Sequence, residues 1–207
     1  MNEANAAVIG AGVVSFLPGL SLAQKDKVKL ALALAERATQ TAFDEGLVQD
    51  WFAYYRNQLK FMGWDAVSAE QVHWPDAGRA EQVDKVLALI TKTAGERFAS
   101  NVEMSLQRLR NSPETLASLE KNARERGHFQ LLPCAPAGQN RVDMVLYHEV
   151  DTQDAWRAGF ITRKRSMKNV RAELVRFNIL AFENSYLSKV HQRVVEVSLK
   201  RIHDYDI

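Results

Sequence analysis

The sequence predicts a single α+β domain in which the helical first two-thirds packs on a C-terminal antiparallel sheet, closed by a C-terminal helix. Apolar residues recur at helical spacing up to about residue 127, and beyond that point they alternate with a period of two. The 207 residues include 46% apolar and 25% charged residues, which are ordinary values for a globular protein. No linker, internal repeat or low-complexity segment divides the chain, so we expect one domain over residues 1–207.

Residues 1–20 form an apolar, glycine-rich segment. No charged residue occurs from Ala4 to Gln24, and Glu3 stands where a secretory signal would carry Lys or Arg. Glycines and a proline interrupt the segment, which falls short of the about 20 predominantly apolar residues of a spanning helix. We expect an N-terminal arm that packs on the domain or touches a membrane surface.

Two helices follow the arm. Ser21 with Gln24 three residues later is a capping-box pattern, which predicts a helix to about Phe43. Asp50 is suited to cap a second helix, and Gly63 stands where a C-terminal capping glycine is expected. The next segment, to about residue 74, is expected to be extended.

Aromatic residues are dense in and around the second helix. Their spacing is typical of a helix face that points into a core, and a ligand or lipid pocket is the alternative. We therefore expect Trp51 and Trp64 to be mostly buried.

Three more helices are expected before residue 128. Apolar spacing predicts one helix marked by residues 83–90 and ending near Gly95, and another marked by residues 98–109. Ser112 followed by Pro113 predicts the start of the next helix, which closes at Gly127.

The remainder of the chain is expected to be rich in strands. Residues 141–150 alternate strictly between the two faces of a strand, and 129–134 is a suitable partner strand. Two further strands are expected near 158–162 and 170–182, although the second pattern also partly fits a helix. Residues 186–197 return to helical spacing and predict the closing helix.

Charge and motifs exclude several classes of function. The 27 basic and 25 acidic residues balance to +2, which is too even for nucleic acid as a partner of the whole chain. The five histidines show no metal-ligand spacing, and His148 lies on the apolar face of its strand, where a core role is more common. Hydrolase elbows, phosphate loops and zinc-protease helices are absent from the sequence. No metal and no cofactor is therefore expected, apart from a covalent fatty acyl group considered below.

Cys134 is the single cysteine, so an internal disulfide is excluded. Proline cannot donate to a sheet ladder, so Pro133 and Pro136 predict a thiol at a strand end or edge. The thiol could be a buried hydrophobe, a nucleophile, a lipid attachment point or an intermolecular bridge, and all four interpretations stay open.

A basic run follows the predicted strands, with no acidic residue between Asp154 and Glu173. A solvated strand face or hairpin tip is the usual explanation of such a run. Five basic residues could also attract anionic lipid headgroups, at roughly 1 kcal/mol each near the surface. The candidate membrane-surface residues are Arg163, Lys164, Arg165, Lys168 and Arg171.

Several short stretches together resemble one known family. They are Leu17-Pro-Gly-Leu-Ser21, Trp51-Phe-x-Tyr-Tyr55, Leu59-x3-Gly63-Trp64, Val83-Asp-Lys-Val86 and Phe129-Gln-Leu-Leu-Pro-Cys134. In order and spacing they are similar to the Evf family, named for an Erwinia virulence factor, from about Leu17 to the C-terminus. The resemblance implies helices packed on an antiparallel sheet, a fatty acyl chain such as palmitate joined to Cys134 by a thioester, and no enzymatic activity.

The leading interpretation is a non-enzymatic bacterial virulence-type protein, or toxin, that carries or binds a fatty acyl chain and acts at membranes. The implied partners are membrane lipid and a host-cell target. We expect synthesis in the bacterial cytoplasm without a signal peptide, followed by peripheral membrane association or non-classical export. One acyl chain gives only marginal anchoring, so the basic run would supply a second signal. Alternatively, the acyl chain folds back into the aromatic core as a structural ligand.

Two other functions stay open at this point. In the first, Cys134 passes an acyl group to an acceptor, with a histidine as base. His128 and Arg141 are close to Cys134 in the sequence and could lower the pKa of its thiol. In the second, the chain is a plain interaction or immunity-type domain with an inert Cys134.

Overall fold

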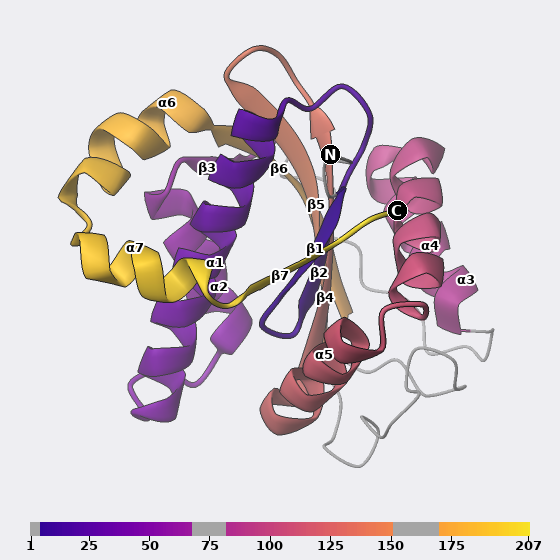
Figure 1. The fold of residues 1–207 in the computed structure, drawn as a ribbon, viewed down its shortest axis with the longest axis horizontal. Helices are drawn as coiled ribbons and strands as arrows, with labels where there is room; N and C mark the ends of the chain where they lie inside the picture. Colours follow the sequence, from indigo (N-terminus) through magenta and orange to yellow (C-terminus); the bar gives the residue numbers. More distant parts are fainter. Residues whose placement is uncertain (1–4, 68–81, 151–169) are drawn as a thin grey trace.

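The computed structural model describes residues 5–67, 82–150 and 170–207. These residues form a mixed seven-stranded sheet that lies between two layers of helices (Figure 1). This arrangement confirms the predicted α+β class. The strands are β1 (Ala6–Ile9), β2 (Gly12–Phe16), β3 (Trp64–Ala66), β4 (His128–Pro136), β5 (Arg141–Val150), β6 (Val170–Asn178) and β7 (Ile202–Tyr205). Their order across the sheet is β3-β6-β5-β4-β2-β1-β7, and β2 with β4 is the parallel pair.

The helices are divided between the two faces of the sheet. They are α1 (Leu22–Asp44), α2 (Trp51–Phe61), α3 (Gln82–Ala94), α4 (Glu96–Leu109), α5 (Pro113–Arg126), α6 (Ile179–Ala181) and α7 (Gln192–Leu199). One face carries α1, α2, α6 and α7, and we call it the α1–α2 face. The other carries α3, α4 and α5, and we call it the α3–α5 face. Side chains alternate between the two: Leu132 points into the first layer and Leu131 into the second.

The sequence signals for helix ends are confirmed. Ser21 and Gln24 make both reciprocal hydrogen bonds of the capping box at the start of α1. The side chain of Asp50 accepts a hydrogen bond of 3.0 Å from the amide of Ala53 and so caps α2. Gly127 ends α5 at a φ of 68°, in the left-handed region that favours glycine.

Residues 1–20 were expected to form an arm that packs on the domain or touches a membrane surface, and the described part of this segment instead belongs to the sheet. Residues 6–16 form the β1–β2 hairpin inside the sheet, where β2 pairs with β4 and β1 pairs with β7. A strand covered by helices on both faces needs apolar side chains on both sides, which explains an uncharged segment without alternation. The hairpin turns at Gly10, whose φ is 58°, and a Cβ there would lie 2.7 Å from the Glu36 Oε1 atom.

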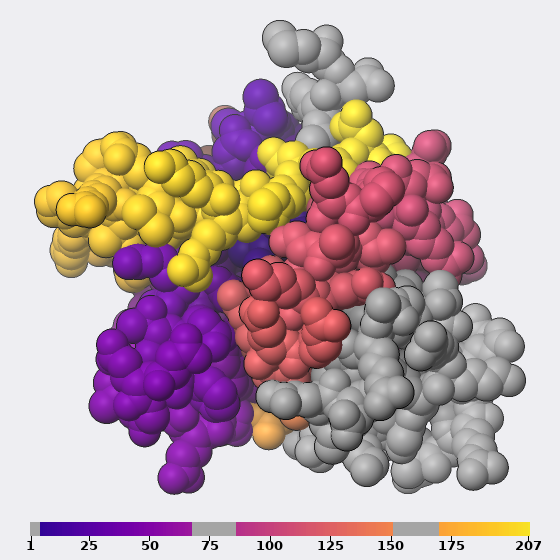
Figure 2. All heavy atoms as spheres, turned by 60° about the horizontal axis from the view of Figure 1, so that its bottom comes forward, coloured from indigo at the N-terminus to yellow at the C-terminus, as the bar shows by residue number. Residues whose placement is uncertain are grey.

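The C-terminal region differs in detail from the predicted closing helix. β6 ends at Asn178, and α6, a π-helical turn (Phe182–Tyr186) and a 3-10 turn (Leu187–Lys189) precede α7. After α7 the chain returns to the sheet as β7, an edge strand that pairs with β1. The sequence did not predict this strand, because the polar pair His203-Asp204 lies at its centre. Figure 2 shows this C-terminal segment passing over both helical layers. The strand expected near 158–162, and the extended segment beyond residue 67, lie outside the described residues.

Candidate functional site

Cys134 lies in the interior of the protein. It belongs to β4, the fourth strand of the seven, and its partners in register are Phe16 of β2 and Met144 of β5. Its side chain is completely buried. Of the two predicted positions, the sheet edge is wrong, whereas Cys134 does lie near an end of its strand, two residues before Pro136. The sheet accommodates Pro133, which has no amide hydrogen, by a gap in the β4–β5 pairing between Leu131 and Cys134.

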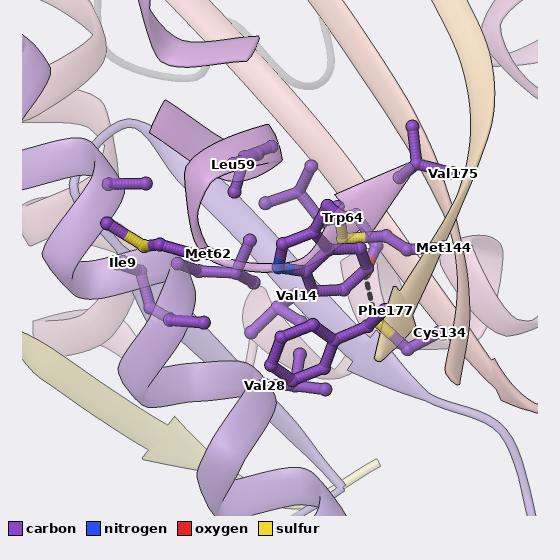
Figure 3. Close-up of a cluster of buried hydrophobic side chains, with 14 of the residues drawn as sticks. Ile9, Val14, Val28, Leu59, Met62, Trp64, Cys134, Met144, Val175 and Phe177 are labelled. Atoms are coloured by element: carbon purple, nitrogen blue, oxygen red, sulfur yellow. Dashed lines mark hydrogen bonds between the residues drawn. The ribbon is translucent and has the colours of Figure 1, made fainter. Parts of the chain in front are cut away.

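The thiol of Cys134 faces the apolar layer under α1 and α2. Figure 3 shows Trp64, Phe177, Met144 and Val14 gathered with it on the same side of the sheet. The Sγ atom donates a weak hydrogen bond of 3.4 Å to the carbonyl oxygen of Leu132. Burial raises the pKa of the Cys134 thiol well above its usual value. The closed structure therefore holds a protonated thiol, which is a poor nucleophile.

The two residues expected to activate the thiol lie elsewhere. His128 is six residues back along β4, which corresponds to about 20 Å of extended strand. Arg141 is exposed at the start of β5 and pairs in register with Asn178. Neither residue can stabilise a thiolate at Cys134 in this structure.

The predicted basic run is described only at its last member. Arg163, Lys164, Arg165 and Lys168 lie outside the described residues. Arg171 belongs to β6, where its guanidinium carbon lies 5.0 Å from the centre of the Phe52 ring. Its Nη1 atom also donates to the Asp50 carboxylate at 3.3 Å. The side chain of Arg171 thus packs between β6 and the start of α2.

A cluster of buried histidine and aromatic rings, which the sequence analysis did not anticipate, lies under the start of α2. The ring centre of Trp51 is 4.1 Å from that of His128 and 5.7 Å from that of His148. The two histidine rings are 5.2 Å apart, and His148 lies 4.7 Å from Phe52. The burial expected for Trp51 is confirmed, as is the core position of His148.

Both histidines of this cluster are neutral at pH 7. Burial lowers the pKa of His128 to about 3, and the charge of Arg126 contributes to the same shift. Burial also lowers the pKa of His148 well below its usual value, assisted by His128 and Arg171. The Nε2 atom of His148 has no hydrogen-bond partner among the described residues, while its Nδ1 atom lies 3.4 Å from Gln130 Nε2. The register of β4 and β5, which places His148 opposite Gln130, came only with the structure, so the sequence pattern did not bring these rings together.

A buried ionic cluster joins the two helical layers at the tip of the β1–β2 hairpin. Glu36 of α1, 3% exposed at its side chain, pairs with Arg126 of α5. Arg201, more exposed, lies 3.6 Å from the second carboxylate oxygen of Glu36. Asn122 donates a hydrogen bond of 3.0 Å to the carbonyl of Gly10. These residues are distant in sequence, so no local pattern predicted the cluster.

The described residues include no group of three or more metal-ligating side chains. None of the helices in the described part of the chain is long and apolar enough to cross a bilayer.

The class defined by these observations is an α+β protein with a mixed sheet between two helical layers and one thiol sealed inside. One solved structure similar to it is that of the Evf virulence factor. The two chains are 16% identical, the alignment covers 100% of this chain and 86% of that one, and the TM-score is 0.39. The likeness to that virulence factor is distant. No protein-family model and no curated protein matches the sequence.

Proposed function

We propose that this chain is a non-enzymatic, virulence-type bacterial protein that holds a fatty acyl chain as a thioester of Cys134. The observation that carries the proposal is the complete burial of the thiol in an apolar layer with Trp64 and Phe177. The motif resemblance to the Evf family supports the virulence-type role. An acyl chain on Cys134 would lie between the sheet and α1–α2, as a structural ligand of the core.

The energetics favour an inward over an outward acyl chain. Each buried methylene contributes about 0.8 kcal/mol relative to exposure to water, so a long chain gains several kcal/mol by staying inside. Cys134 faces the interior, and a chain leaving its sulfur enters apolar surroundings first. This supports the structural-ligand form of the proposal over a free membrane anchor at the thiol.

The thioester would form by exchange with an acyl thioester donor. The sulfur of Cys134 bonds to the acyl carbon, the donor's carbon–sulfur bond breaks, and the thiol proton passes to the departing thiolate. Because the folded thiol is buried and protonated, this exchange has to precede closure of the α1–α2 layer or follow its transient opening.

Intact-mass measurement of the purified protein tests the proposal. We expect a persistent added mass near that of a long acyl group, released by neutral hydroxylamine, which cleaves thioesters. Cys134→Ala should abolish the adduct. Cys134→Ser should abolish it too, at a stability cost of about 1–3 kcal/mol because a hydroxyl then enters an apolar layer. At a strand end, the position that the sequence predicted, the same substitution would leave stability nearly unchanged.

Three outcomes would contradict this proposal. An adduct that survives in Cys134→Ala places the lipid elsewhere, and an unmodified thiol that reacts only after unfolding favours a plain interaction domain. Loss of the acyl group during turnover would indicate an acyl-transfer enzyme. That alternative lacks support at present, since His128 and His148 lie toward the other end of the strands that meet at Cys134.

Membrane association through the basic run is the second part of the proposal. Binding to anionic vesicles should weaken as salt rises, because the Debye length falls from about 10 Å at 0.1 M to about 3 Å at 1 M. Changing Arg163, Lys164 and Arg165 to Gln should lower vesicle affinity without altering the melting temperature. A flotation assay measures the affinity.

A matched control variant removes three positive charges from a surface outside the basic run. Arg110, Lys121 and Arg124 are exposed on the α3–α5 side, and changing them to Gln should leave vesicle binding nearly unchanged. Equal binding of both triple variants and the parent at every salt concentration would refute anchoring through the basic run.

A further inference from the structure

We propose that a pocket between α2 and β6 binds a small monocarboxylate that carries a short aromatic or aliphatic group. The pocket has a volume of about 290 Å³, near the lower limit of ligand sites. Phe52, Ala53, Arg56 and Asn57 of α2 form one wall, and Arg171 and Glu173 of β6 form another. It lies apart from Cys134, so this inference stands independently of the acyl chain.

The charges on the wall select a single negative charge. Two guanidinium groups, those of Arg56 and Arg171, face one carboxylate, that of Glu173. Arg56 is already held by Glu173, with its Nε atom 2.5 Å from the carboxylate oxygen. Asp50 in turn pairs with Arg171, so the arginines of the pocket are balanced by two carboxylates. A monoanion that takes the place of Asp50 keeps this balance, whereas a dianion would meet repulsion from the buried Glu173. Arginine presents paired donors that fit a carboxylate well.

Apart from the exposed Asn57, the rest of the wall is apolar, and its floor is rigid. Phe52 is buried, and its ring rests on His148, which in turn contacts Trp51. A pocket floor made of stacked rings is preorganised, so little conformational entropy is lost when a ligand binds. The volume corresponds to about ten water molecules at roughly 30 Å³ each, which suits a ligand of benzoate size.

Asp50 acts as a competitor for the ligand. Its carboxylate, about half exposed, accepts from Arg171 at 3.3 Å. An incoming carboxylate replaces Asp50 on this guanidinium, and an exposed ion pair of this kind costs little to exchange. Removing the charge of Asp50 should therefore strengthen ligand binding, while removing that of Arg171 should weaken it.

Titration calorimetry with benzoate, butyrate and the neutral isostere benzamide tests the inference on the full chain. We expect benzoate to bind about 10- to 100-fold more tightly than benzamide, since one charge-assisted contact is lost in benzamide. Arg171→Gln should weaken benzoate binding by a similar factor. Asp50→Asn should strengthen it a few-fold, because Asn caps α2 as well as Asp does. Comparing benzoate with butyrate tells an aromatic ligand from an aliphatic one.

Sulfate serves as the dianion control and should bind more weakly than benzoate. Lys60→Gln, on the exposed side of α2, removes one positive charge outside the pocket and should leave benzoate affinity unchanged. Equal affinity for benzoate and benzamide, no benzoate binding at about 10 mM, or no effect of Arg171→Gln would each overturn the inference. Because Cys134 is intact in every variant, failure here leaves the acyl proposal untouched.

Discussion

Replacing Arg126 with Met should lower the free energy of unfolding by about 3–5 kcal/mol. Arg126 is the close partner of Glu36, whose carboxylate is buried between the two helical layers. Without Arg126 the buried carboxylate keeps, among the described residues, the partner Arg201 at 3.6 Å, which is more exposed and compensates its burial poorly. Urea denaturation followed by circular dichroism measures the loss.

Two control variants separate the cost of a stranded charge from the cost of lost packing. The double variant Glu36→Leu with Arg126→Met should recover most of the stability, because a buried pair replaced by apolar residues is often neutral. Arg201→Met should cost less than about 1 kcal/mol, as expected for a more exposed partner. If the single variant Arg126→Met proved as stable as the parent, the cluster would not join the layers as described.

Replacing Trp51 with Ala should destabilise the protein by about 3–5 kcal/mol, as large aromatic truncations in cores do. Trp51 stacks on Tyr55 with 4.8 Å between ring centres, and it covers both buried histidines. Its indole nitrogen also donates to Gln40 at 3.2 Å. Phe61→Ala is the matched control: this ring is 73% exposed, so its loss should change stability by no more than about 0.5 kcal/mol.

The Trp51→Ala effect should also depend on pH. In the parent, burial lowers the pKa of His128 to about 3. Between this value and the ordinary pKa of 6.5, the unfolded chain protonates His128 and the folded chain does not. Stability from this group is present above pH 6.5 and is lost as pH falls toward 3. Opening the cover lets His128 charge in the folded variant. The difference in unfolding free energy between parent and variant should therefore be smaller at pH 5 than at pH 7. An equal difference at both pH values would contradict the idea that Trp51 shields His128 from water.

Local sequence patterns were enough to predict the helices and the most regular strand, β5. The capping box at Ser21, the cap at Asp50 and the left-handed Gly127 each act within one turn of a helix, so they can be predicted from a few adjacent residues. Strict alternation from Arg141 to Val150 likewise identified β5, whose side chains do point alternately to the two layers. Core positions for Trp51 and Trp64 followed from the same kind of spacing.

The tertiary structure alone decided where those elements go. An apolar run such as Ala6 to Phe16 satisfies a surface arm and a doubly covered strand equally well by pattern. Only pairing with β4 and β7, far along the chain, makes it a central hairpin. The sequence predicted a strand end or a sheet edge for Cys134, and only the tertiary structure showed that its strand is central, because the depth of Cys134 depends on which strands flank β4. Glu36 and Arg126 are 90 residues apart in the sequence. The local spacing of apolar and polar residues therefore could not predict that they form an ion pair.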